Sequence, residues 1–355
     1  MLSNNDNSPH HAKLIKRRLF IGGGLFILLV AISILSIRVG SYYISPFEII
    51  SALVGKYEGD TLYHVIWNIR LPRSIGAIVA GASLGLAGLI MQNVLKNPLA
   101  SPFTLGVTQG AAFGAAFAII ILGAGKIHAA GNVGITVTSQ YLVVVSAFSG
   151  ALLTVMLILF LSSLRNMGPE SIILAGVAVS ALWASATMLM QYFASDVHVS
   201  ATVFWTFGDL GKAGWMQNSI MSAVLILALI YFIYNSWNYN ALLWGDESAK
   251  SLGVNVKAIR ISSMIIASLL VSVATAFLGI IGFIGLISPH IVRFMIGNDH
   301  RFLIPYTALF GGFLLLVSDT IARTVMSPVV LPVGIITSFA GAPMFLYLLM
   351  RGRRL

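Results

Sequence analysis

The sequence contains no cysteine, and only 9% of its 355 residues are charged. The absence of cysteine excludes disulfides, thiol catalysis and thiolate metal sites. Charged residues make up about 25% of an average soluble domain, whereas 58% of this chain is hydrophobic. A water-soluble fold of this length could not bury so much apolar side chain, so the composition indicates a membrane protein.

Acidic residues are scarce as well, with 11 Asp and Glu against 21 Lys and Arg and a net charge of +10. The basic residues lie in loops between apolar runs and form no basic stripe, so we expect no nucleic-acid partner. Glu170, Asp209 and Asp319 fall at the ends of apolar runs. A proton- or sodium-driven carrier usually needs carboxylates inside the membrane. The scarcity therefore argues against secondary transport and indicates that another protein supplies the energy.

Motifs for catalysis are absent too. There is no G-x-x-x-x-G-K-[ST] phosphate loop and no H-E-x-x-H pair, so we expect no ATPase site of the chain's own. The histidines are scattered, and His290, which follows Pro289, is interpreted as a capping or packing residue in preference to a ligand or proton relay. We expect no catalytic residue, no bound cofactor and no metal in this chain.

The apolar runs predict an all-α, polytopic membrane protein with about ten transmembrane helices, because a span needs about 20 apolar residues. Two of the ten runs are short or interrupted, by Pro289 and Arg293 in one and by Pro305 in the other. The expected spans are Leu19–Ile37, Ser74–Leu95, Leu105–Leu122, Tyr141–Leu161, Ser171–Tyr192, Trp215–Tyr234, Ile261–Ile281, Phe283–Ile296, Phe302–Val317 and Val333–Met350.

Loop charges orient these spans, because Lys and Arg gather on the cytoplasmic side. With both termini inside, 14 of the 21 basic residues fall inside. Residues 1–18 are then a cytoplasmic tail, 19–350 the transmembrane domain and 351–355 a second cytoplasmic tail. Two loops are long enough for short surface helices. They are the outer segment 41–73, where Ser45 is a possible helix cap, and the inner loop 235–260.

Several Gly and Pro residues interrupt the apolar runs. Irregular backbone is tolerated within a membrane only where it is buried in protein or lines a wet cavity, and such breaks mark binding sites in transporters. We therefore assign helix breaks along a transport pathway to Asn97, Pro98, Pro102, Gly282, Gly285, Pro289, Gly341 and Pro343.

The inner loop 235–260 is the expected docking site for the energy-supplying partner. Asp246 and Glu247 suit the first turn of a short helix, and Ser248 follows them. Ala249 and Leu252 are expected on one apolar face of that helix, and Gly253 is expected to end it. A compact helix of this kind fits a groove on a partner protein; the alternative is a solvated or lipid-facing loop.

Arg70 and Arg73 of "RLPR" fall on the outer side, against the usual rule for basic residues. Two interpretations stand side by side. The arginines anchor the second span to lipid headgroups by snorkelling, or they bind an acidic partner, with Pro72 holding them in place.

Long motifs of the chain resemble the FecCD-type permeases, the membrane subunits of ABC importers for ferric siderophores, haem and cobalamin. The similarity runs from about residue 69 to 349. It is carried by "RLPR" at 70–73, "AGLIMQNVLKNPLASPFTLGVTQGA" at 87–111, "WTFGDL" at 205–210, "SAKSLGV" at 248–254, "GFIGLISPHIVRFMIGNDHR" at 282–301, "SDTIARTV" at 318–325 and "LPVGIITSFAGAPMFLYLL" at 331–349.

The resemblance implies the fold of a type II ABC importer permease in the cell membrane of a bacterium, with ferric siderophores as the expected cargo. It implies a second permease subunit and a cytoplasmic ATPase dimer, which uses the ATP and docks on 246–260. It also implies an extracytoplasmic binding protein whose glutamates meet Arg70, Arg73 and Arg323. One position departs from the family pattern, because Val330 stands where a glutamate is usual, and this favours a non-identical second permease that keeps the glutamate. The alternatives are a carrier of organic cations, an exporter permease, or a haem or cobalamin permease of the same family.

Overall fold

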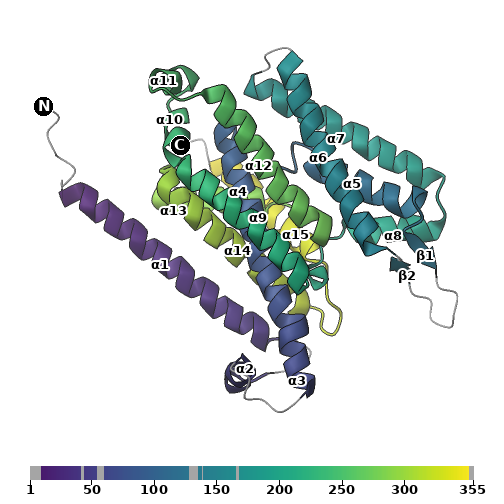
Figure 1. Ribbon diagram of the computed structural model, residues 1–355. Helices are drawn as coiled ribbons and strands as arrows, with labels where there is room; N and C mark the ends of the chain where they lie inside the picture. The colour runs from purple at the N-terminus through teal and green to yellow at the C-terminus, as the bar shows by residue number, and fades with distance from the viewer. Residues whose placement is uncertain are drawn as a thin grey trace, which may run out of the picture.

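The computed structural model describes residues 9–40, 44–53, 60–127, 135–137, 139–164 and 168–351, so tail residues 1–8 and 352–355 lie outside the described residues. Helices make up nearly all of the chain that is described (Figure 1). The one sheet in these ranges is an antiparallel hairpin of β1 and β2, with Lys126 opposite Thr136. The elements are α1 (Pro9–Arg38), α2 (Pro46–Leu53), α3 (Asp60–His64), π-helical η1 (Val65–Arg70), α4 (Leu71–Val94), α5 (Val107–Ala116), π-helical η2 (Phe117–Ile121), β1 (Gly125–Ile127), β2 (Ile135–Val137), α6 (Gln140–Leu164), α7 (Pro169–Tyr192), α8 (Asp196–Thr206), 3₁₀-helical η3 (Leu210–Lys212), α9 (Trp215–Tyr234), α10 (Ser236–Leu242), α11 (Asp246–Ser251), α12 (Val256–Leu278), α13 (Ile284–Ile296), α14 (His300–Thr324) and α15 (Val333–Arg351).

The ten expected spans are confirmed as ten apolar helices. Seven helices of the described chain are long and apolar enough to cross a membrane, and three shorter apolar ones cover 107–121, 284–296 and 333–347. Large apolar side chains on α6 and α7 remain exposed, such as Phe160 and Leu174. In a bundle surrounded by lipid, such side chains need no protein partner.

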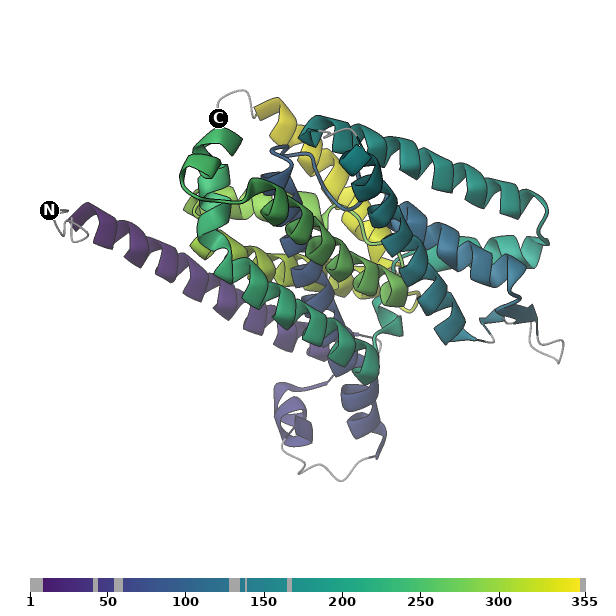
Figure 2. The same ribbon diagram turned by 45° about the horizontal axis from the view of Figure 1, so that its top comes forward.

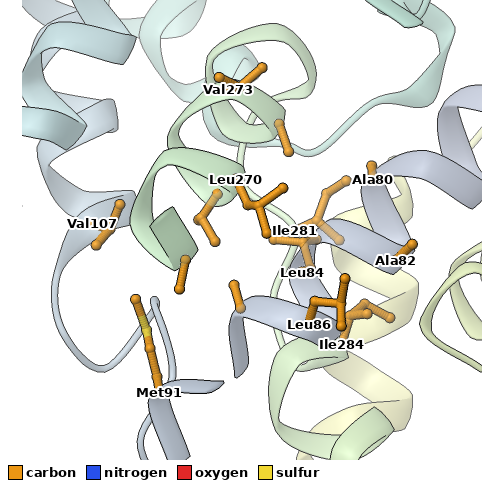
Figure 3. Close-up of a cluster of buried hydrophobic side chains, with 14 of the residues drawn as sticks. Ala80, Ala82, Leu84, Leu86, Met91, Val107, Leu270, Val273, Ile281 and Ile284 are labelled. Atoms are coloured by element: carbon orange, nitrogen blue, oxygen red, sulfur yellow. The ribbon is translucent and has the colours of Figure 1, made fainter. Parts of the chain in front are cut away.

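The centre of the bundle is α4, which is buried along almost its whole length. It packs against α14, α12, α13 and α9, while α5–α8 form a group to one side of it (Figure 1). Small residues allow this close packing: a Cβ added to Gly81 would lie 2.2 Å from the carbonyl oxygen of Gly311. Leu84, Leu86 and Ile284 fill the space around this helix (Figure 3).

The two ends of the bundle carry different short helices. At one end, hereafter the α11 end, α10 and α11 join α9 to α12; at the opposite end, the α2 end, α2 and α3 project beyond the long helices (Figure 2). The expected cap of α2 is confirmed as a reciprocal pair. The backbone N–H of Glu48 donates to Ser45 Oγ at 3.2 Å, and the backbone N–H of Ser45 donates to Glu48 Oε2 at 2.8 Å.

Three boundaries differ from those expected. α1 begins at Pro9, so the second half of the expected tail 1–18 is helical. α12 begins at Val256 and takes up the end of the inner loop 235–260. The helix α8 was not anticipated, since its 11 residues are too few to span a membrane and too apolar to look like a surface helix.

Four of the expected helix breaks are wrong. Asn97, Pro98 and Pro102 do lie in the non-helical connection 95–106, and Gly282 lies in the connection 279–283. In contrast, Gly285 and Pro289 lie inside the continuous helix α13, and Gly341 and Pro343 lie inside α15.

The reason is that a proline removes only one backbone hydrogen bond, the one to the carbonyl four residues earlier. For Pro289 that carbonyl belongs to Gly285, and it accepts a hydrogen bond from Gln92 Nε2 at 3.4 Å instead. A neighbouring helix thus satisfies the freed group, as is common for prolines in membrane helices.

Candidate functional site

A buried cluster of ionised side chains lies at the α2 end of the bundle. The carboxylate of Asp319, on α14, is fully buried. Arg73, near the start of α4, reaches it through Nε and Nη2 at 3.0 and 2.9 Å, and Arg323, one turn after Asp319, does so through Nε at 3.0 Å. Asp209 lies 3.7 Å from Arg73 Nη2 and is more exposed. Two forked cations on one carboxylate join α4 to α14.

Arg323 and a third arginine, Arg70, hold the end of α1. Arg323 Nη2 donates to the carbonyl of Ser36 at 3.0 Å and to its hydroxyl at 2.7 Å, and Nη1 donates to the carbonyl of Val39 at 3.2 Å. Arg70 Nη1 donates to the carbonyls of Ile37 and Arg38 at 2.6 and 3.1 Å. The last carbonyls of a helix have no partner within it, and arginine cations suit that negative end.

The structure therefore brings together the three arginines predicted as docking residues, and it gives each an intramolecular partner. Their side chains are turned inward: Arg70 is 6% exposed, and the side chains of Arg73 and Arg323 are 12% and 9% exposed. Docking of an acidic partner at these residues stays a prediction. Val330 lies exposed in the connection between α14 and α15 at the same end.

Three irregular segments meet inside the bundle, next to the middle of α4. The backbone N–H of Asp209 donates to the carbonyl of Leu278 at 2.9 Å, and that of Gly334 donates to the carbonyl of Gly208 at 3.3 Å. Gly208 is required here, because a Cβ would lie 2.4 Å from the carbonyl oxygen of Ile280. Each segment supplies hydrogen bonds that another lacks, as non-helical backbone within a membrane requires.

A cavity of about 320 Å³ opens beside this junction. It is mainly apolar, and the phenylalanines Phe103, Phe207, Phe283 and Phe339 come to it from four separate segments of the chain. Gly282, one of the predicted break residues, also lines it. The cavity is large enough for part of a ligand and has few groups that would hold a polar one in place.

The predicted docking helix forms at the α11 end, as α11. Gly253 ends it with a φ of +85°, which glycine adopts without strain. The N–H of Gly253 donates to the carbonyl of Lys250 at 2.9 Å, and the N–H of Val254 donates to that of Ala249 at 3.0 Å. These are the two hydrogen bonds of a Schellman motif, so the predicted glycine stop is confirmed.

The expected apolar face of α11 is wrong in one respect. Ala249 is fully buried, whereas Leu252 is 70% exposed. The helix is so short that Leu252 already lies in the turn after it, where the chain direction has changed. Glu247 and Lys250 form an exposed ion pair at 2.8 Å, and Ser248 is exposed as well.

Asp246 anchors α11 to the long helices. Its carboxylate lies 2.8 Å from Lys96 Nζ and 2.9 Å from Arg260 Nη2, and Arg260 Nε donates to the carbonyl of Val94 at 2.9 Å. Burial alone would raise the pKa of Asp246, but the hydrogen bonds from Lys96 and Arg260 lower it below its usual value. The last turn of α4 and the first turn of α12 are thus both joined to α11.

A second carboxylate, Asp299, joins α1, α10 and α14 at the same end. Arg18 and Arg301 lie 3.0 and 2.8 Å from it, and Asn240 Nδ2 donates to it at 3.1 Å. These hydrogen bonds, from Arg301 above all, outweigh burial and lower the pKa of Asp299.

No signal in the sequence indicates that Asp299 or Lys96 belongs to a cluster of charges. Asp319 is identified there only as an acid at the end of a span, although the spacing of four residues to Arg323 predicts a pair.

The chain is similar in sequence and in fold to several known proteins. The model of the FecCD transport family matches residues 28–351. A Methanocaldococcus jannaschii protein, provisionally named as an ABC transporter permease, is 55% identical over 97% of this chain and 98% of its own length. A hemin transport system permease protein of Yersinia pestis is 35% identical over 96% of this chain and 97% of its own. A solved structure, described as the inward-facing conformation of a provisionally assigned metal-chelate type ABC transporter, has a TM-score of 0.80 at 30% identity, over 93% of this chain and 99% of the other.

Proposed function

The chain belongs to the FecCD transport family and is the permease of an ABC importer, and we propose that this importer carries a ferric chelate of the siderophore class. The proposed assembly contains a second permease, a cytoplasmic ATPase dimer and an extracytoplasmic binding protein. The α11 end faces the cytoplasm, together with both termini. ATP is bound by the ATPase subunits, and this chain adds neither a cofactor nor an ATPase site.

One observation carries the coupling proposal: a single buried helix connects the two clusters. α4 begins beside Arg73, which is bonded to Asp319, and ends at Val94, whose carbonyl is bonded to Arg260. The next residues include Lys96, which is paired with Asp246 of α11. Binding at the outer end and ATP hydrolysis at the inner end would therefore act on the same rigid element.

Close packing makes α4 a suitable connector. A Cβ on Gly88 would lie 1.8 Å from the carbonyl oxygen of Gly285, so α4 and α13 approach with no side chain between them. The same holds for α4 and α14 at Gly81 and Gly311. Because packed interiors do not deform continuously, a shift of α4 would move these neighbours with it.

The cavity beside the junction of the three irregular segments is mainly apolar and has few polar groups. This fits a bulky cargo that passes through without tight binding. In the proposal, the pathway lies between this chain and the second permease. The neighbouring helix α15 supports this with an exposed apolar face, which includes Phe339, Leu346 and Met350. The relative described as a hemin transport permease supports an iron-containing cargo, and the solved structure described as metal-chelate type supports a metal chelate.

The test is uptake into proteoliposomes that contain the chain with its ATPase, second permease and binding protein. We expect ATP-dependent uptake of a ferric hydroxamate or catecholate chelate that needs the binding protein, and no ATPase activity of the chain alone. Uptake of hemin or cobalamin in its place would overturn the siderophore cargo and leave the importer. Movement of an organic cation on a proton gradient without ATP would overturn the importer itself.

The orientation has a separate test, which the cysteine-free sequence makes direct. Ser248 on α11 and Tyr63 on α3 are both exposed. In intact cells, a membrane-impermeant maleimide should label Tyr63→Cys and leave Ser248→Cys unlabelled until the membrane is opened. The reverse labelling pattern would show that the proposed membrane topology is inverted.

A further inference from the structure

A second cavity, of about 330 Å³, lies at the α11 end and has a different character from the first. Its lining includes two cations, Lys96 and Arg293, and the side-chain amides of Gln92, Asn93 and Asn298. The chain comes to it from the end of α4, the turn before α11 and the end of α13. Polar groups that converge on a cavity of this size are typical of a binding site.

Arg293 is the unusual member of this lining. It is partly buried, yet none of the ion pairs within the described part of the chain includes it. Its guanidinium contacts Gln92 Oε1, with both Nη1 and Nη2 at a long 3.4 Å. A cation removed from water and offered only a distant neutral acceptor is unfavourable, and an anion in the cavity would correct this.

Asn93 supplies an independent observation. It is 7% exposed and lines the cavity, and its Oδ1 has no hydrogen-bond partner. Its Nδ2 donates to the carbonyl of Tyr239 at 3.2 Å, and this bond fixes which end of the amide is the oxygen. The buried Oδ1 therefore needs a donor, and none of the described residues provides one.

The backbone at Lys96 is also held in an uncommon conformation. Lys96 has a φ of +48°, and Phe283 is the other non-glycine residue with a positive φ in the described ranges. A lysine rarely adopts this region, and such outliers gather at functional sites. Here the conformation accompanies a side chain that is paired with Asp246 and lines the cavity.

We propose that this cavity binds a phosphate group that carries a hydroxyl, with Arg293 as its main cationic partner. The planar guanidinium suits a phosphate through two parallel hydrogen bonds. An ionised carboxylate or a sulfate brings acceptors only, whereas a hydroxylated phosphate can also donate to Asn93 Oδ1. Free phosphate has this chemistry, and so does a phosphoglycerol lipid headgroup at the membrane surface. The inference uses the fold and not the cargo, so its failure would leave the proposed function untouched.

The test measures the Tm of the purified full chain in detergent as phosphate is added at constant ionic strength. We expect a saturable rise in Tm with phosphate and at least a tenfold weaker response to sulfate and acetate. Arg293→Gln should raise the half-maximal phosphate concentration at least tenfold. The matched control is Arg301→Gln, which removes an arginine at the same end but outside the cavity lining and should respond as the unaltered chain does.

A second variant provides an independent test if Arg293→Gln does not fold. Gln92→Glu places a carboxylate where Oε1 now contacts Arg293, and so provides an internal anion. Gln92→Glu also removes the Nε2 donor to the carbonyl of Gly285, which lowers stability whatever the cavity binds. The readout is therefore the phosphate response and not the starting Tm, and we expect this variant to lose that response. Equal responses to phosphate, sulfate and acetate, or an unaltered response in both variants, would overturn the proposal.

Reconstitution in nanodiscs distinguishes free phosphate from a lipid headgroup as the ligand. If a lipid headgroup is the ligand, phosphatidylglycerol will raise the Tm relative to phosphatidylcholine in the unaltered chain but not in Arg293→Gln, and free phosphate will add nothing in phosphatidylglycerol. If free phosphate is the ligand, it will raise the Tm equally in both lipids. An unchanged Tm in all four conditions would overturn the site.

Discussion

Arg73 and Asp319, 246 positions apart in the chain, form a buried ion pair in which Nε and Nη2 of the arginine both lie within 3.0 Å of Oδ1. Arg323 shares the carboxylate and also bonds to Ser36 and Val39 at the end of α1. These two arginines therefore have an internal function. They close the α2 end of the bundle by joining α1, α4 and α14.

The first prediction concerns the stability of this cluster. Asp319→Asn removes the one charge that both arginines share, and breaking a buried ion pair costs roughly 3–5 kcal/mol. We expect a clear drop in the Tm of the purified chain. Asp209→Asn is the control, because that carboxylate is more exposed and 3.7 Å from Arg73, where a pair contributes about 0–1 kcal/mol. A small effect of Asp319→Asn would contradict the assigned role.

The second prediction separates docking from structure. Arg73→Gln combined with Asp319→Asn removes both partners of the pair. Arg323 loses the shared carboxylate in this variant and in Asp319→Asn alone, so the two variants differ only at Arg73. If the arginines bind carboxylates of a binding protein, the affinity of that protein for the complex will fall at least tenfold, or about 1.4 kcal/mol. Asp319→Asn alone frees the arginines and will not weaken binding.

Binding at low and at high salt provides the control, because exposed charges are screened by added ions. Docking predicts that the difference between the two variants shrinks as salt rises. The same affinity in both variants and in the unaltered complex would exclude docking at Arg73 and leave a structural or lipid-anchoring role.

The third prediction concerns α11. Gly253 has a φ of +85°, and proline is restricted to about −65°, so Gly253→Pro must disrupt the Schellman motif. We expect the chain to reach the membrane at normal levels, because the change lies outside the long helices, and to lose uptake while the ATPase still hydrolyses ATP. Ser248→Ala, on the exposed side of the same helix, should retain uptake. Normal transport by Gly253→Pro would refute the docking assignment.

The fourth prediction is a pH dependence. The pKa of Asp246 is lowered in the folded chain, so its ion pairs stabilise the anchoring of α11 above the usual pKa of an aspartate. This stabilisation is lost as the pH falls through the lowered folded value. The anchoring should therefore be constant from neutral pH to about pH 4 and weaken only below that.

Fluorescence of a dye on Ser248→Cys reports this loss. Asp246→Asn should show the loosened state at all pH values, because Lys96 and Arg260 then have no anion at that position. A transition of the unaltered chain between pH 5 and 7 would contradict the assignment and indicate a histidine in its place.

The sequence was sufficient for features that depend on neighbouring residues. The apolar runs predict all ten apolar helices, the seven long enough to cross a membrane and the three shorter ones, because a helix satisfies its own backbone in lipid. The Ser45 cap and the Gly253 stop also follow from residues within one turn. The breaks predicted at the prolines inside α13 and α15 are wrong, because whether a helix tolerates a proline depends on hydrogen bonds that another helix provides. For Pro289 that helix is α4, through Gln92.

Only the tertiary structure decided which charges meet. Asp319 and Arg323 are four residues apart, so their pairing is visible in the sequence. The pairing of Asp319 with Arg73 depends on how α4 and α14 cross. The pairing of Asp246 with Lys96 and Arg260 depends in the same way on how α4 and α12 cross. Those crossings are determined by glycine contacts such as Gly81 with Gly311. Apolar helices are nearly equivalent in lipid, so close packing at small residues, and not hydrophobicity, selects their neighbours. That selection places each arginine beside its carboxylate.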